Sequence, residues 1–139
     1  MSKPNLILAS ASPRRKQLLQ MAEVDFEIIT QDTDERYPPG LSMEETAIYI
    51  ATQKGRAVQK KYSNRKILAA DTIVVLDNSI IGKPAGRQDA IEILSRLSGK
   101  THQVITGVVI LDQENMISFA DKTLVTFYQI TPGQIEHYV

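Results

Sequence analysis

The sequence predicts an α/β fold in which helices flank a mixed β-sheet. Strand-like and helix-like segments alternate in the first part of the chain, whereas hairpin patterns dominate the later part. Alternation favours parallel strand pairs and hairpins give antiparallel pairs, so together they indicate a mixed sheet. The length of 139 residues suits one domain with its own core. We therefore expect a single domain over residues 1–139.

The first elements are a strand, a helix and a second strand. Residues 5–9 (NLILA) form a short apolar run, and Ser12 followed by Pro13 supplies an N-cap and a first helical residue. Residues 26–30 (FEIIT) alternate like a strand. An acidic loop with two prolines follows. We expect the apolar side of the first helix to consist of Leu18, Leu19 and Met21 or Ala22.

The second helix begins with a capping-box pattern, Ser42 with Glu45, and is expected to end near Tyr62. Its apolar stripe has spacings of three and four residues, which predicts one core-facing side. A charged residue, Lys54, falls on this stripe, so it either extends its amine to solvent or meets an anion. The stripe consists of Ala47, Ile50, Ala51, Lys54 and Val58.

Hairpins and two more helices complete the expected order. Residues 66–83 read as a long apolar strand, a turn at Asp77 and Asn78, and a short return strand. An amphipathic helix follows, with Gly99 at its C-cap. Two β-rich segments then join near residues 113–115, and a last helix begins after Thr131, at Pro132.

Composition narrows the possible functions. Sixteen Lys and Arg residues balance sixteen Asp and Glu residues, and this formal net charge of +0 gives no global attraction to nucleic acid or to an anionic membrane. With Cys 0 and His 2, disulfides, a cysteine nucleophile and a histidine-rich zinc centre are not expected. The N-terminal apolar run is too short for a signal segment or a membrane span. A cytoplasmic protein is the default expectation.

The stretch LILASASPRRKQLLQ suggests a site for an anion. Ser10 and Ser12 precede a helix N-terminus, which offers hydroxyls, backbone N–H groups and the positive end of the helix dipole. Arg14 and Arg15 add guanidinium groups that match phosphate oxygens. The alternative is a capped helix whose first turn carries solvated arginines.

Asp71 is the only ionised side chain in the apolar run 67–76. A buried carboxylate is costly unless it is paired or binds a metal. The hairpin turn places Lys83 opposite Thr72 or its neighbours, so we expect Asp71 and Lys83 to lie within about two cross-strand positions, roughly 5 to 8 Å apart. Asp71 is therefore a catalytic candidate, and a purely structural pair with Lys83 is the alternative.

The acidic loop offers oxygen ligands for Mg²⁺ or Mn²⁺, in the carboxylates of Asp32, Asp34 and Glu35. Such loops are also commonly just solvated. His102 and His137 look incidental, because a lone histidine near a strand start is more often structural.

Four segments in this order and spacing, LILASASPRRKQLL, AADTIVVLD, IIGKP and LSGKTHQVITGV, make the chain resemble the Maf family of nucleoside triphosphate pyrophosphatases. The resemblance covers essentially the whole chain. It implies the fold of the inosine triphosphate pyrophosphatases (Maf/Ham1), a homodimer, and hydrolysis of a nucleoside triphosphate to the monophosphate and pyrophosphate.

The resemblance also assigns roles. It makes Asp71 the proton acceptor, Glu35 the family's acidic position, and Lys83, like Lys54, a triphosphate-binding lysine. We expect Asp71, Glu35 and Lys83 to be the catalytic residues, and we expect Asp71 and Glu35 to hold Mg²⁺ or Mn²⁺. Arg15 together with Thr72 matches the branch that acts on dTTP and UTP rather than the branch for 7-methyl-GTP. The residues expected to bind substrate are Ser10, Ser12, Arg14, Arg15, Lys54 and Thr72.

Family members continue past the point where this chain ends, through a segment with a glutamine implicated in base choice, so base specificity stays open. One rival hypothesis is a nucleotide-binding regulator of septum formation without physiological turnover. Another is nucleic-acid binding through Arg14, Arg15 and Lys16, which zero net charge and Trp 0 disfavour.

Overall fold

The computed structural model describes residues 5–139 and divides into two compact units. Unit 1 comprises residues 5–71 and 106–121, and unit 2 comprises residues 72–105 and 122–139. A six-stranded sheet has the order β2 (Phe26–Ile28), β1 (Leu6–Leu8), β3 (Lys66–Leu76), β5 (Thr101–Asp112) and β6 (Asn115–Thr126). Strand β4 (Ser79–Ile81) pairs with β3 off this path. The sheet holds parallel and antiparallel pairs, as predicted. The assignment of one domain to residues 1–139 stays a prediction.

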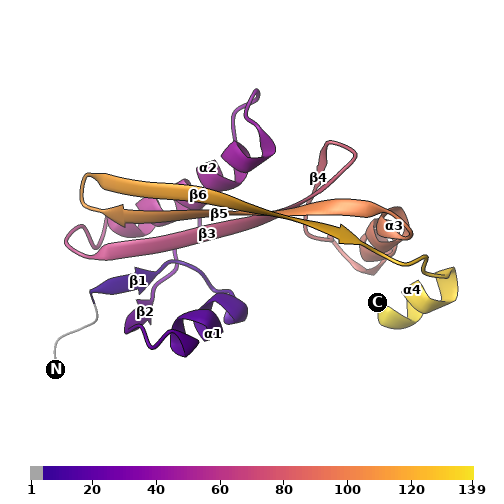
Figure 1. The fold of residues 1–139 in the computed structure, drawn as a ribbon, viewed down its shortest axis with the longest axis horizontal. Coiled ribbons are helices and arrows are strands. Elements are labelled where there is room, and N and C mark those ends of the chain that lie inside the picture. Colours follow the sequence, from indigo (N-terminus) through magenta and orange to yellow (C-terminus); the bar gives the residue numbers. More distant parts are fainter. Residues whose placement is uncertain (1–4) are drawn as a thin grey trace. The chain divides into compact units, whose positions relative to one another are not determined.

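The parallel part of the sheet lies in unit 1 (Figure 1). Strand β1 (Leu6–Leu8) pairs with β2 (Phe26–Ile28) on one side and with the start of β3 (Lys66–Leu76) on the other. Helix α1 (Pro13–Met21) connects β1 to β2, and helix α2 (Met43–Gln59) connects β2 to β3. These strands and both helix starts confirm the sequence-based expectations.

Helix α2 supplies one side of the core of unit 1. Its predicted capping box is present, with the Ser42 hydroxyl accepting from the Glu45 N–H at 3.1 Å. The four apolar residues of the predicted stripe are all buried. Ala51 and Val58 pack against the sheet, because they share a core cluster with residues of β1, β3 and β5 and of the loop after β1. The cluster consists of Ile7, Ala9, Ala51, Val58, Ile67, Ala69, Val109 and Leu111.

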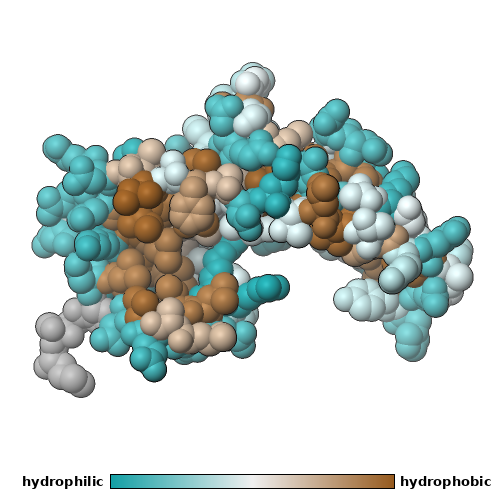
Figure 2. Space-filling model, viewed as in Figure 1, coloured by the Kyte–Doolittle hydropathy of each residue, from teal (hydrophilic) through white to brown (hydrophobic). Residues whose placement is uncertain are grey.

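The predicted apolar side of α1 is not buried. No residue of α1 is buried, and the side chains of Leu18 and Met21 are 56% and 79% exposed. Figure 2 shows hydrophobic atoms at the surface of unit 1 where α1 and β2 lie. The apolar residues of the α1 sequence predict which side of the helix is hydrophobic, but they do not predict whether another element packs on that side.

Unit 2 contains the β3–β4 hairpin turn and the later helices. Asp77 and Asn78 form the turn with positive φ of 52° and 62°, and β4 (Ser79–Ile81) pairs with β3 in the register Val74↔Ile81. Helix α3 (Arg87–Leu97) is followed by Gly99 with φ of 68°, as expected for a helix end.

Strands β5 (Thr101–Asp112) and β6 (Asn115–Thr126) cross both units, and the predicted turn between them is present. Helix α4 (Pro132–Tyr138) begins after Thr131, as the sequence predicts. Among residues 5–139, no helix combines the length and apolarity needed to span a bilayer.

Candidate active site

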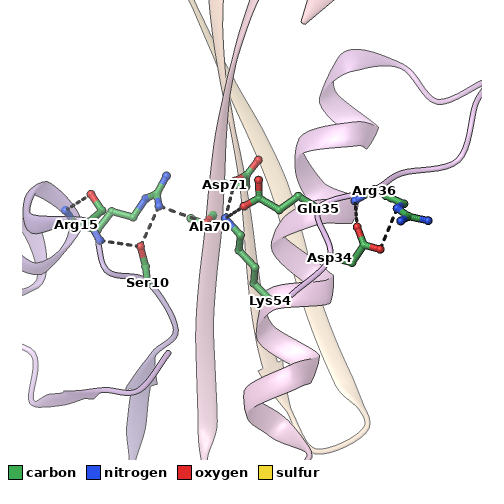
Figure 3. Close-up of polar contacts among 9 residues, drawn as sticks. Ser10, Arg15, Asp34, Glu35, Arg36, Lys54, Ala70 and Asp71 are labelled. Atoms are coloured by element: carbon green, nitrogen blue, oxygen red, sulfur yellow. Dashed lines mark hydrogen bonds and ion pairs between the residues drawn. The ribbon is translucent and has the colours of Figure 1, made fainter. Parts of the chain in front are cut away.

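The ammonium group of Lys54 joins two carboxylates in unit 1 (Figure 3). Its Nζ atom lies 2.8 Å from Oδ1 of Asp71 and 3.0 Å from Oε1 of Glu35. Asp71 is placed by strand β3, Lys54 by the core-facing side of helix α2, and Glu35 by the loop that follows β2. Three separate segments of the chain thus meet at one nitrogen.

Burial differs among the three groups. The Asp71 side chain is 13% exposed, that of Lys54 26% and that of Glu35 57%. Burial by itself lowers the pKa of Lys54, but hydrogen bonds to Asp71 and Glu35 and their negative charges outweigh it and raise the pKa above the ordinary 10.5. Lys54 is therefore a cation at physiological pH.

A second cation, Arg15, reaches the same strand. Its Nη1 donates to Oγ of Ser10 at 3.0 Å and to the carbonyl oxygen of Ala70 at 3.3 Å. In Figure 3, Arg15 and Ser10 approach β3 from one side, and Lys54 and Glu35 from the other. Burial lowers the pKa of Arg15, and the charge of Asp71 opposes this effect. Asp71 thus lies in the field of two cations.

The parallel pairing of β1 with β3 explains why Arg15 reaches this strand. Leu8 pairs with Leu68, and the N–H of Ala9 still donates to the Leu68 carbonyl at 2.9 Å. The loop that follows β1 therefore runs beside Ala70. Sites at the carboxyl ends of parallel strands are common in α/β proteins.

Two of the donors expected for an anion are used within the loop itself. The N–H of Ser12 donates to Oγ of Ser10 at 3.2 Å, and Oγ of Ser12 accepts from the N–H of Arg15 at 3.4 Å. Arg14, the neighbouring arginine, is exposed. In this conformation the two serine oxygens order the start of α1 by accepting from backbone N–H groups. The O–H groups of the serines and the guanidinium groups are the donors that an anion could use without displacing these bonds.

Five of the predicted site residues lie on the two sides of strand β3: Ser10, Arg15, Glu35, Lys54 and Asp71. The ion-pair partner of Asp71, however, differs from the predicted one. We expected Lys83 from the hairpin register, whereas the bonded cation is Lys54. The hairpin register itself is confirmed, but β4 ends at Ile81, two residues before Lys83. Lys83 and Thr72 belong to unit 2, and their roles stay predictions.

Two features of the site were missed at the level of sequence. No sequence signal identifies the Ala70 carbonyl as an acceptor for Arg15. The Lys54–Asp71 pair could have been predicted, because Lys54 lies on the core-facing stripe of its helix and Asp71 is the only charged residue in the apolar run 67–76. What was lacking was the knowledge that α2 packs on β3.

The acidic loop contributes Glu35 rather than all of its carboxylates. Asp34 instead pairs with Arg36 at 3.1 Å, and both side chains are largely exposed. Within residues 5–139, no group of three or more His, Asp and Glu side chains could hold a metal ion. Asp71 and Glu35 nevertheless fit Mg²⁺ or Mn²⁺, because these ions need only one or two carboxylates when phosphate oxygens and waters complete the shell.

The model of the Maf-like protein family matches residues 5–139 of the chain. The chain belongs to the Maf family. Among its curated relatives, the dTTP/UTP pyrophosphatase of Bacillus mycoides (strain KBAB4) is 45% identical over 134 residues, which are 96% of this chain and 70% of that protein. The dTTP/UTP pyrophosphatase of Bacillus cereus (strain G9842) is 42% identical, with the same coverage.

Solved structures show the same fold at low sequence identity. The Ham1 protein of Staphylococcus aureus superposes with a TM-score of 0.59 at 15% identity, over 87% of this chain and 70% of that one. A Ham1 protein from Coxiella burnetii gives a TM-score of 0.57 at 17% identity, over 87% and 71% of the two chains. These likenesses confirm the predicted Maf/Ham1 fold.

Proposed function

We propose that this Maf protein is a nucleoside triphosphate pyrophosphatase that hydrolyses dTTP and UTP to the monophosphate and pyrophosphate. One observation carries the proposal: Asp71 and Glu35 share the Lys54 ammonium, with Arg15 beside the same strand. Clustered carboxylates and cations suit hydrolysis of a phosphoanhydride, and the relatives named dTTP/UTP pyrophosphatase support the substrate.

In the proposed reaction, Asp71 orients a water molecule toward the α-phosphorus and accepts a proton from it. The new bond joins the water oxygen to phosphorus, and the bond from phosphorus to the bridging oxygen breaks, so pyrophosphate leaves. Arg15 and Lys54 stabilise the negative charge that spreads over the transferring group and the leaving group. Catalysis then depends mainly on positioning and charge.

Asp71 and Glu35 would hold the Mg²⁺ or Mn²⁺ ion, which supplies further neutralisation of the triphosphate charge. Asp71 is thus proposed both as a metal ligand and as the acceptor of the proton from water, and these two roles compete for one carboxylate. Lys83 and Thr72 keep their roles in catalysis and substrate binding as part of the proposal. The homodimer, the cytoplasmic location and a role in septum formation also stay predictions.

The test is pyrophosphate release from dTTP, UTP, CTP, ITP and 7-methyl-GTP with Mg²⁺ or Mn²⁺. We expect release from dTTP and UTP, and its near-complete loss in the Asp71→Asn variant. Asp34→Asn is the matched control, because Asp34 pairs with the exposed Arg36 and should leave turnover unchanged. Near-wild-type turnover by Asp71→Asn would remove Asp71 from the mechanism.

The same panel separates the alternatives. Preference for 7-methyl-GTP would assign the chain to that branch of the family. Binding of nucleotides by the folded protein without release from any of them would favour a nucleotide-binding regulator.

A further inference from the structure

We infer that Lys54 competes with the divalent cation for Asp71 and Glu35, so that cation binding requires Lys54 to leave the two carboxylates. This inference rests on the metal-assisted reaction proposed above and assigns Lys54 an additional role in it. The ammonium acts as a built-in counter-ion, and the triphosphate becomes its alternative partner.

The first argument is geometric. One nitrogen contacts an oxygen of each carboxylate, at 2.8 Å and 3.0 Å. A cation that binds the same two oxygens would have to occupy the region where the ammonium lies. A cation on the other oxygen of each carboxylate would still be only a few Å from the ammonium, where two positive charges repel strongly.

The second argument is the balance of charge around Asp71. This carboxylate already lies beside Lys54 and in the field of Arg15, whose guanidinium is held by Ser10 and by the Ala70 carbonyl. A divalent ion would add two further positive charges to this small region. New negative charge is therefore needed, and a triphosphate can supply it.

The third argument concerns which groups can move. Asp71 belongs to strand β3 and is nearly buried, whereas Glu35 lies in a loop and is more than half exposed. Lys54 carries its charge on a flexible four-carbon stem. Lys54 can thus rotate toward a triphosphate while Asp71 keeps its place, and this exchange would couple cation binding to nucleotide binding.

The experiment measures Mn²⁺ binding without nucleotide, from the loss of the free-ion electron paramagnetic resonance signal. We expect Lys54→Met to bind Mn²⁺ about tenfold more tightly than the wild-type protein, since a competing cation is gone. Lys61→Met is the control, because Lys61 donates to the amide oxygen of Gln31 rather than to a carboxylate. Its affinity should match that of the wild-type protein.

Equal or weaker Mn²⁺ binding by a folded Lys54→Met protein would overturn the inference. If circular dichroism shows that this variant does not fold, Lys54→Gln, which keeps a polar end, decides the question by the same criterion. Adding Asp71→Asn to the variant used should abolish the gain in affinity. Retention of the gain would place the ion elsewhere and also overturn the inference.

Failure of this inference can be told apart from failure of the proposed function. Release of pyrophosphate by the wild-type protein tests the function, whereas Mn²⁺ binding without nucleotide tests the competition. An active enzyme with unchanged Mn²⁺ affinity in Lys54→Met would retain the function and refute the competition.

Discussion

Gly107 of strand β5 lies directly against the backbone of Ala47 in helix α2. A Cβ atom at position 107 would come within 2.4 Å of the carbonyl carbon of Ala47 and 2.5 Å of the N atom of Ile48. Both distances are far below van der Waals contact. Glycine therefore allows the helix that carries Lys54 to approach the sheet.

We expect Gly107→Ala to lower the free energy of unfolding by about 2 kcal/mol, because the clash involves backbone atoms that cannot rotate away. Urea denaturation measures this loss. Gly133→Ala is the control, since a Cβ there meets nothing within 4 Å. Equal stability of the Gly107→Ala and wild-type proteins would show that α2 can shift outward at little cost.

The ion pairs of Lys54 should stabilise the fold in a pH-dependent way. The folded-state pKa of Lys54 is raised above the ordinary 10.5, so its contribution is fully present below about pH 10.5 and is lost as pH rises through the folded-state pKa. The difference in unfolding free energy between the wild-type protein and Lys54→Met should be constant from pH 7 to about pH 10 and narrow above it. A difference that grows with pH would contradict this sign.

Arg15→Lys should reduce kcat/KM for dTTP by about tenfold to a hundredfold, because an ammonium lacks the planar guanidinium that matches two phosphate oxygens at once and that Ser10 and the Ala70 carbonyl orient beside β3. Steady-state kinetics with dTTP measures the effect. The control is Arg36→Lys, since Arg36 is exposed and pairs only with the exposed Asp34 among the ion pairs described. Unchanged kinetics in Arg15→Lys would mean that charge alone suffices at this position.

In unit 2, Ser98 connects the end of helix α3 to the C-terminal segment. Its hydroxyl accepts from the N–H of Ile130 at 2.6 Å and donates to the carbonyl of Ile130 at 3.3 Å. Ser98→Ala should lower the free energy of unfolding by about 1 to 2 kcal/mol and speed hydrogen exchange at Ile130.

Ser95→Ala is the matched control for this prediction. Within the part of the chain that the structure describes, the bond of the Ser95 hydroxyl goes to the Ile91 carbonyl of its own helix, so its loss should be neutral or slightly stabilising. Slower or unchanged exchange at Ile130 in Ser98→Ala would contradict the role of Ser98.

Features governed by neighbours in the chain were predictable from the sequence. The cap of α1 at Ser12, the capping box at Ser42 and the turn at Asp77 and Asn78 are all present. The physical reason is that caps and tight turns depend on hydrogen bonds and backbone angles over a few residues. The burial of the α2 stripe was predictable from its period.

Only the tertiary structure decided which distant groups meet. The sequence by itself marked Asp71 and Lys54 as charges on apolar elements, but it predicted Lys83 as the partner of Asp71. It likewise did not reveal that α1 leaves Leu18 and Met21 exposed, or that β1 lies between β2 and β3. Periodicity shows which face of an element is apolar, whereas packing between elements determines what that face, and any charge on it, will contact.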